Sequence, residues 1–319
     1  MNMNAALGSY FFSKELSRRT REWYDAKIGV FIRWAEHHTC AVHETRCSQI
    51  ENIETTHIRE FFQVLRDTPS PAINHQHNPP TDSTIHGYAR AIKAWLNWCA
   101  KEGLIDERVI KRLEMPKREK RIIEVFTRQQ IDELLRACKR RYQSGYYKWL
   151  GERDKTIIML LLDTGIRASE LCGLTLDDVR LGVEDAYIVV SGKGRKQREC
   201  PLGKSTRNQL HTYLYRFRPD SKDTHVFLNR SGQALALEGL SAVLYELKQK
   251  TDIKGVRCSP HDFRHTFAYN FMAQGGDVLR LSRLLGHTDL GVTAEYLQAF
   301  TSRDARQGYV SVADSMLGK

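Results

Sequence analysis

The chain has 319 residues, of which 41% are hydrophobic and 27% charged, a composition typical of a folded protein long enough for two domains. Its longest apolar run extends from Ile157 to Leu162, far too short to cross a membrane. The formal net charge of +11 favours a polyanionic partner, most often nucleic acid, although a basic solvated surface would give the same balance.

The basic excess is unevenly distributed along the chain. Residues 1–116 have a net charge of +1 and residues 117–319 a net charge of +10. The N-terminal stretch, Met1 to Asn4, lacks the basic and apolar regions of a secretion signal. We therefore expect a cytoplasmic, nucleoid-associated protein that binds its polyanion mainly through the C-terminal two thirds.

The seven cysteines are scattered and never spaced Cys-x-x-Cys, which fits a reducing cytosol and argues against a disulfide framework. One compact cluster could be interpreted as a zinc site, but its spacings match no familiar zinc module. We expect no metal and no other cofactor. The cluster contains His37, His38, Cys40, His43 and Cys47.

Residues 1–115 are predicted to form a small helical domain. Apolar residues recur at three- to four-residue steps, and the stretch from Asp67 to Pro80, with four prolines, is expected to be a loop. Because helical patterning begins near residue 14, we expect no separate arm-binding domain before it. Helices are predicted over about 14–36, from a cap at Thr56, over 82–101 with a stop at Gly103, and near 106–113.

A linker is predicted over residues 116–125. Proline disfavours a continuous helix, and the charges that follow have no apolar partners. Basic residues in such a segment can lie along a phosphate backbone, so we assign them to DNA binding. They are Lys117, Arg118, Lys120 and Arg121.

Residues 126–319 are predicted to form a second domain, mostly helical with a small sheet. Two β-rich stretches, Ala186–Val190 and Arg198–Leu202, flank a glycine turn and predict an antiparallel hairpin. The fold class is therefore mainly α with a small antiparallel β-sheet. Helices are predicted from a Thr127–Gln130 capping box, over 152–164 with a stop at Gly165, and near 203–215, 238–250, 260–274, 277–285 and 289–299.

Two segments of this domain place basic residues at ordered positions. Arg167 opens a helix, although a surface pair with Glu170 three residues later is the simpler explanation when the segment is taken alone. Lys193 lies at the hairpin tip between two glycines, which permit a close approach to a ligand, although a solvated turn is the plain alternative. Three further cations at the tip, Arg195, Lys196 and Arg198, are assigned to DNA binding.

Two later segments supply imidazoles and a hydroxyl. His261 and Arg264 share one face of a predicted helix start, where backbone N–H groups favour an anion, and His265 faces elsewhere and is expected to be structural. His287 follows a glycine, and Tyr296 comes nine residues later. A lone tyrosine in a helical pattern usually belongs to a core, so its chemistry depends on the other segments.

In this order the segments resemble the tyrosine recombinase family, also called phage integrases. That family has a Gly-[Leu/Ile]-Arg-x-x-Glu-Leu segment, a Gly-Lys-Gly hairpin, a His-x-x-Arg, a Leu-Gly-His and a tyrosine nine residues beyond. The resemblance covers about residues 120–300; the N-terminal domain matches only by size and class. The threonine pair that usually precedes the tyrosine is here Thr293-Ala294.

The resemblance implies a site-specific recombinase that cuts and rejoins DNA through a 3′-phosphotyrosine, without metal or ATP. It also implies a core-binding domain (1–115) and a catalytic domain (126–319) that clamp double-stranded DNA with inverted-repeat core sites. It further implies a homo-tetramer on two DNA sites, with the tail 297–319 packed on a neighbour. A frayed or self-docked tail is the alternative.

The chemistry of phosphodiester cleavage agrees with this set of residues. A five-coordinate phosphorane gains negative charge, which preorganised cations stabilise. Arg167, Arg264 and His287 can donate to the phosphate, and Lys193 can protonate the leaving 5′-oxygen. His261 can accept the proton of the nucleophile Tyr296 or hold the phosphate, and Glu170 can orient its neighbours.

Three other functions remain to be separated from this one. A type IB topoisomerase uses the same chemistry without exchanging partners, and a DNA-binding regulator can keep the fold without catalysis. A metal-dependent nuclease requires clustered carboxylates, which the sequence does not show. The sequence identifies neither the DNA target nor the kind of genetic element, and it does not show whether the tyrosine acts in cis.

Overall fold

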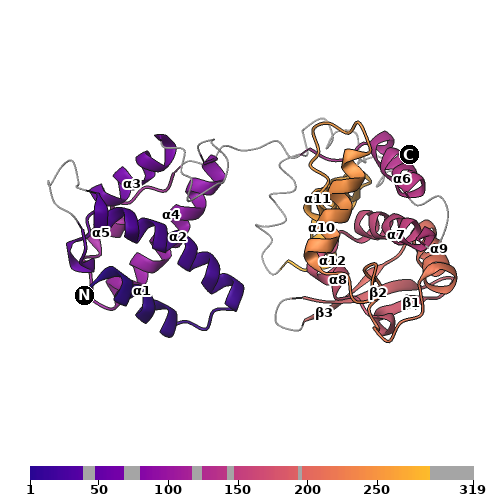
Figure 1. Ribbon diagram of the computed structural model, residues 1–319, viewed down its shortest axis with the longest axis horizontal. Coiled ribbons are helices and arrows are strands. Elements are labelled where there is room, and N and C mark those ends of the chain that lie inside the picture. The colour runs from indigo at the N-terminus through magenta and orange to yellow at the C-terminus, as the bar shows by residue number, and fades with distance from the viewer. Residues whose placement is uncertain (39–46, 68–79, 117–123, 142–146, 193–195, 288–319) are drawn as a thin grey trace, which may run out of the picture. The chain divides into compact units, whose positions relative to one another are not determined.

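The computed structural model describes residues 1–38, 47–67, 80–116, 124–141, 147–192 and 196–287. The chain divides into two compact units, Met1–Arg121 and Ile122–Lys319 (Figure 1). Each unit buries its own hydrophobic core, so each is described by itself. The fold class predicted from the sequence, mainly α with a small antiparallel sheet, is confirmed.

The first unit is helical in its described parts. Helix α2 packs against α1, α3 and α4, and α4 also contacts α1 and α5. The aromatic centre is formed by Phe31, Phe61 and Trp95, all fully buried. The helices are α1 (Met3–Phe12), α2 (Arg18–His37), η1 (Ile50–Asn52), α3 (Thr55–Asp67), α4 (Asp82–Lys101) and α5 (Arg108–Lys111).

Two predictions for this unit were wrong. Helical structure begins at Met3 and not near residue 14, because Asn2 caps α1 by accepting the N–H of Ala5. Helix α3 begins at Thr55, so Thr56 lies inside its first turn and does not cap it. The hydroxyl of Thr55 instead donates to the carbonyl of Val109, 2.9 Å away.

The second unit is arranged around α7 (Lys148–Thr164), which packs against α6, α9, η4 and α11 (Figure 1). Its apolar stretch from Ile157 to Leu161 is buried except at Met159, as expected for a central helix. The other helices are α6 (Arg128–Arg141), α8 (Ala168–Cys172), η2 (Leu176–Asp178), α9 (Lys204–Thr212), η4 (Tyr213–Phe217), α10 (Leu237–Gln249), α11 (Pro260–Ala273) and α12 (Val278–Leu285).

A three-stranded antiparallel sheet with the order β1-β2-β3 lies beside these helices. The predicted hairpin is present as β2 (Ala186–Ser191) and β3 (Gln197–Pro201), with Val190 opposite Arg198. The edge strand β1 (Val179–Leu181) was not predicted, because three residues are too short for a recognisable alternation. Burial alternates along β2, so one face of this strand packs on the core.

Several helix ends in this unit agree with the sequence signals. Thr127 and Gln130 exchange hydrogen bonds in the predicted capping box. Gly165 ends α7 and Gly286 ends α12, both in the left-handed region, with φ values of 59° and 65°. Helix α9 stops at Thr212, where the chain continues as the π-helical turn η4. The helix predicted over 289–299 lies outside the described residues.

Candidate active site

Arg167 and Glu170 form the first part of the site, at the start of α8. Arg167 is the N-cap residue, and the Glu170 carboxylate accepts its backbone N–H at 2.8 Å and its Nη1 at 2.9 Å. Arg167 Nη2 also donates to the carbonyl of Gly286 at 3.3 Å. The expected pair with Glu170 is thus present, and the same guanidinium reaches the end of α12.

Arg198 on β3 binds the same carboxylate from the other side. Its Nη1 and Nη2 donate to the two Glu170 oxygens at 2.9 and 2.8 Å, and its Nε donates to the carbonyl of Leu284 at 2.6 Å. The side chains of Arg198 and Glu170 are only 13% and 3% exposed. The structure therefore places the side chain of Arg198 largely inside the second unit.

Glu170 is held as an anion by these donors. Burial alone would raise the pKa of its carboxyl, but hydrogen bonds from Arg198 and from the Arg167 backbone outweigh burial and lower the pKa to about 2. Burial would lower the pKa of Arg198, but the hydrogen bond and the charge of Glu170 outweigh burial and raise it. Glu170 and Arg198 are consequently both charged at neutral pH.

Arg264 joins three separate segments of the chain. It lies on α11 with 3% exposure and donates to the carbonyls of Gly165 and Leu285 at 2.8 and 2.7 Å. Its Nη2 also lies 2.6 Å from Nε2 of His287. Since Gly165 ends α7 and Leu285 ends α12, one guanidinium fixes both helix ends beside the site.

His287 is neutral in this setting. Burial, followed by the positive charges of Arg264 and Arg167, lowers the pKa of its imidazole to about 4. A guanidinium can only donate, so Nε2 of His287 accepts from Arg264 and the ring proton resides on Nδ1. The hydrogen that His287 can offer to a ligand in this state is therefore the Nδ1 hydrogen.

His261 lies in the first turn of α11. This turn begins at a capping box between Ser259 and Asp262 with Pro260 at the first helical position, as the proline predicted. The His261 side chain is exposed, and its ring centroid lies 4.2 Å from that of His265. Arg264 lies one turn further along the helix and, with Arg167 and Arg198, forms an arginine cluster around Glu170 and His287.

Several predicted site residues lie outside the described residues. Lys196 is described: it is exposed, and its carbonyl accepts the N–H of Gly192 at 2.8 Å, closing the base of the hairpin. The residues outside are Lys193, Arg195, Tyr296, the linker cations Lys117, Arg118, Lys120 and Arg121, and the tail 297–319.

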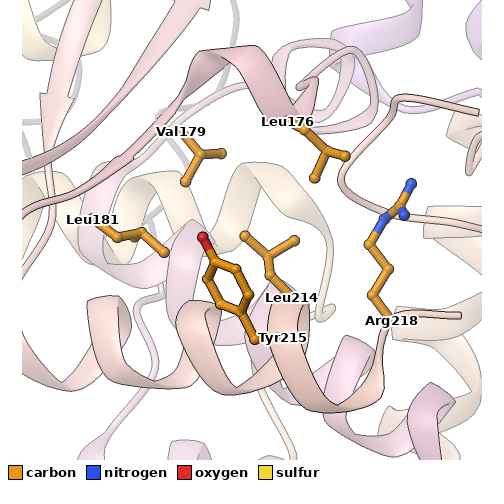
Figure 2. Close-up of a pocket in the computed structure, with 6 residues that line it drawn as sticks. All are labelled: Leu176, Val179, Leu181, Leu214, Tyr215 and Arg218. Atoms are coloured by element: carbon orange, nitrogen blue, oxygen red, sulfur yellow. The ribbon is translucent and has the colours of Figure 1, made fainter. Parts of the chain in front are cut away.

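An apolar hollow of 290 Å³ lies apart from this cluster. Figure 2 shows side chains of η2 and β1 facing Leu214 and Tyr215 across it. Its charged lining residue, Arg218, already donates to the carbonyls of Asp223 and His225. The hollow therefore lacks the convergent donors that a phosphate requires.

The described residues contain no group of three or more side chains placed to hold a metal ion. In the His/Cys cluster that was considered as a zinc site and for which no metal is expected, His37 contacts the carbonyl of Arg33 and His38 contacts Glu60. Cys40 and His43 lie outside the described residues. In the described part of the chain no helix is both long enough and apolar enough to cross a membrane.

Comparison with known proteins agrees with this geometry. Residues 124–303 match the model of the phage integrase family. The tyrosine recombinase XerC of Bacillus subtilis is 32% identical over 219 residues, 67% of this chain and 69% of that protein. XerC of Bacillus pumilus is 33% identical over 239 residues, 72% of this chain and 75% of that protein.

A solved structure extends the likeness to the whole fold. The Tn1549 transposon integrase in complex with transposon right end DNA superposes with a TM-score of 0.73 at 16% identity, covering 100% of both chains. The fold is that of the integrase class. The chain belongs to the phage integrase family, the tyrosine recombinases, and is a site-specific recombinase that breaks and rejoins DNA.

Proposed function

We propose that the cluster of Arg167, Arg264 and His287 binds the scissile phosphate and that Tyr296 attacks it. The observation that carries this proposal is the convergence of three donor groups from distant parts of the chain. The two outermost, Arg167 and His287, are 120 residues apart in the sequence. The two guanidiniums match the non-bridging oxygens of a phosphodiester, and the charge they face increases in the transition state.

In the proposed reaction the Tyr296 hydroxyl attacks phosphorus, the bond from phosphorus to the 5′-oxygen breaks, and a 3′-phosphotyrosine forms. Lys193, in the connection between β2 and β3, gives its proton to the departing 5′-oxygen. His261 accepts the tyrosine proton. Attack by a 5′-hydroxyl of the exchanged strand reverses these steps, so the energy of the phosphodiester is conserved and no metal or ATP is consumed.

The occupied Nε2 and the lowered pKa of His287 support a role as hydrogen-bond donor rather than proton acceptor. In the cluster its Nε2 accepts from Arg264, and its Nδ1 carries the hydrogen. Glu170 supports the cluster by holding Arg167 through both its backbone and its guanidinium. These contacts fix the donors before DNA arrives, which reduces the reorganisation required in the transition state.

For the whole chain we propose a homo-tetramer on two DNA sites, each site an inverted repeat. Residues 1–115 act as the core-binding domain and residues 126–319 as the catalytic domain, joined by a linker whose cations contact the phosphate backbone. The tail 297–319 packs on a neighbouring protomer. The net charge of +10 in residues 117–319 supports DNA as the partner. The proposed location is the cytoplasm, in association with the nucleoid.

The test is a suicide substrate, a candidate site with a nick close to the cleavage position, so that the released fragment diffuses away and the adduct accumulates. The wild-type protein should form a covalent DNA adduct in EDTA, and Tyr296→Phe should form none while binding the same DNA. An adduct that persists in Tyr296→Phe, or one that requires a divalent metal, would contradict the proposal.

A further inference from the structure

Arg198 makes contacts that a DNA-binding arginine does not need. Its guanidinium binds both oxygens of Glu170, and its Nε binds the carbonyl of Leu284 at 2.6 Å. It also lies flat against Gly286, where an added Cβ would be 2.7 Å from Arg198 Nη1. With 13% of its side chain exposed, it presents little surface to a duplex.

Each of these contacts leads to a group that the proposed reaction uses. Glu170 holds the backbone and the guanidinium of Arg167. Leu284 and Gly286 belong to the end of α12, directly before His287. Arg198 therefore connects the strand β3 to the two places in the chain from which the phosphate donors extend.

The charges of the cluster explain why an arginine is required there. Glu170 forms ion pairs with both Arg167 and Arg198, and its carboxylate is almost fully buried between them. A buried carboxylate keeps its charge and orientation when strong donors surround it, and a bidentate guanidinium fixes both of its oxygens at once. Lysine offers a point charge and cannot reproduce this fork while also reaching Leu284.

We propose that Arg198 is a positioning residue for DNA cleavage, acting through Glu170 on Arg167 and through the end of α12 on His287. The inference rests on the proposed function. It assigns Arg198 to the preorganisation of the phosphate donors in place of the DNA contact expected from the sequence. A displacement of such donors by about 1 Å can slow a reaction about 10²-fold.

The experiment compares single-turnover cleavage of the suicide substrate by the full-length wild type and by Arg198→Met, Arg198→Lys and Arg218→Met. Arg218 is the matched control, because it is a partly buried arginine that donates to carbonyls of Asp223 and His225 away from the cluster. At saturating DNA, Arg198→Met should cleave about 10²-fold more slowly. Arg198→Lys should fall between it and the wild type, and Arg218→Met should cleave at the wild-type rate.

A second substrate separates positioning of the phosphate donors from placement of Lys193. In a 5′-bridging phosphorothioate the leaving group is a thiolate, whose conjugate acid has a pKa of about 8.5, so it departs without a proton from the enzyme. If Arg198 acts through Arg167 and His287, the defect of Arg198→Met persists with this substrate. Recovery of the wild-type rate would assign Arg198 to the leaving-group step and overturn the inference.

The remaining outcomes are equally decisive. A wild-type rate at saturating DNA combined with weaker binding would make Arg198 a DNA contact, as first expected, and would overturn the inference. An equal loss of cleavage rate in Arg218→Met would show that the defect of Arg198→Met reflects general stability, and would also overturn the inference. If Arg198→Met does not fold, the comparison is carried by Arg198→Lys. If the wild type itself forms no adduct with the suicide substrate, the proposed function is contradicted. The wild-type reaction thus distinguishes this outcome from failure of the inference about Arg198.

Discussion

Glu170 shows how a single residue can serve local structure and the site together. The pairing with Arg167 three residues earlier, which the sequence offers as an ordinary surface contact, is present at 2.9 Å. The same carboxylate is nearly buried and also binds Arg198 from a strand 28 residues later. The simple explanation and the functional one therefore describe parts of one network.

Gly165 provides a test of packing at one residue beside this network. It has φ 59°, and an added Cβ would lie 2.4 Å from Cδ1 of Phe267. Gly165→Ala should lower the free energy of unfolding by about 2–4 kcal/mol, since strain and overpacking combine. Gly275→Ala is the control, because φ is 83° there with nothing within 4 Å, and it should cost about 1 kcal/mol. Equal losses in denaturant titrations would refute the packing argument.

The site could be predicted from the sequence only in part. The order of basic residues located Arg167, Arg264 and His287, because their types and spacings are local in the chain. The role of Arg198 could not be predicted, since a basic residue near a hairpin tip looks the same whether its side chain faces solvent or a buried carboxylate. That distinction depends on how β3 packs against α8 and α12, which no local pattern contains.

Helices and strands were predicted correctly where the sequence supplies both a periodic apolar pattern and a glycine that ends it. Helix α7 ends at Gly165 and the β2–β3 hairpin turns beside Gly192, as expected. Helix α1 was missed although Met3, Ala6, Leu7, Tyr10 and Phe11 form a regular buried stripe. Its polar face contains no charged residue, so the alternation of apolar and charged residues that marks α2 is absent there.

Helix α11 carries a pH dependence that can be measured. Burial, followed by the charge of nearby His261, lowers the pKa of His265 to about 4. Below about pH 6.5 the unfolded chain takes up a proton that the folded protein binds only below about pH 4. This contribution to stability is therefore complete above pH 6.5 and is lost as the pH falls through this window.

The measurement is the free energy of unfolding of the wild type and of His265→Gln between pH 7 and pH 4.5. The free energy of unfolding should fall with decreasing pH in both proteins. The fall should be steeper in the wild type, because the variant lacks the contribution of His265. His287 contributes in the same direction, because its pKa is also lowered to about 4. A slope unchanged in His265→Gln would show that this imidazole is not held neutral in the fold.

At the scale of the molecule, charge is divided unevenly along the chain. The basic excess lies in residues 117–319, which contain the arginine cluster. The predicted boundaries at residues 115 and 126 stay predictions, as do the roles of the units as core-binding and catalytic domains. The tail beyond Tyr296 contains Leu297, Phe300 and Val310, apolar residues suited to a contact between protomers.

Deletion of residues 303–319 tests that contact. The shortened chain should bind one half-site with unchanged affinity and should populate the higher complexes of a gel-shift ladder less, because the lost contact lies between protomers. A full-length protein with Tyr309→Ala serves as a milder comparison. A ladder identical to that of the wild type would show that assembly does not depend on these residues.

The arginine cluster has a consequence for the protein before it meets DNA. Arg167 and Arg198 share the carboxylate of Glu170, and Arg264 donates to the neutral imidazole of His287. Under the proposed function a phosphodiester adds a negative charge beside these cations, and a ligand that binds only the folded state adds to its stability. We therefore expect the recombination site to stabilise its own enzyme, so that the free energy of unfolding rises as more of the protein is bound to DNA.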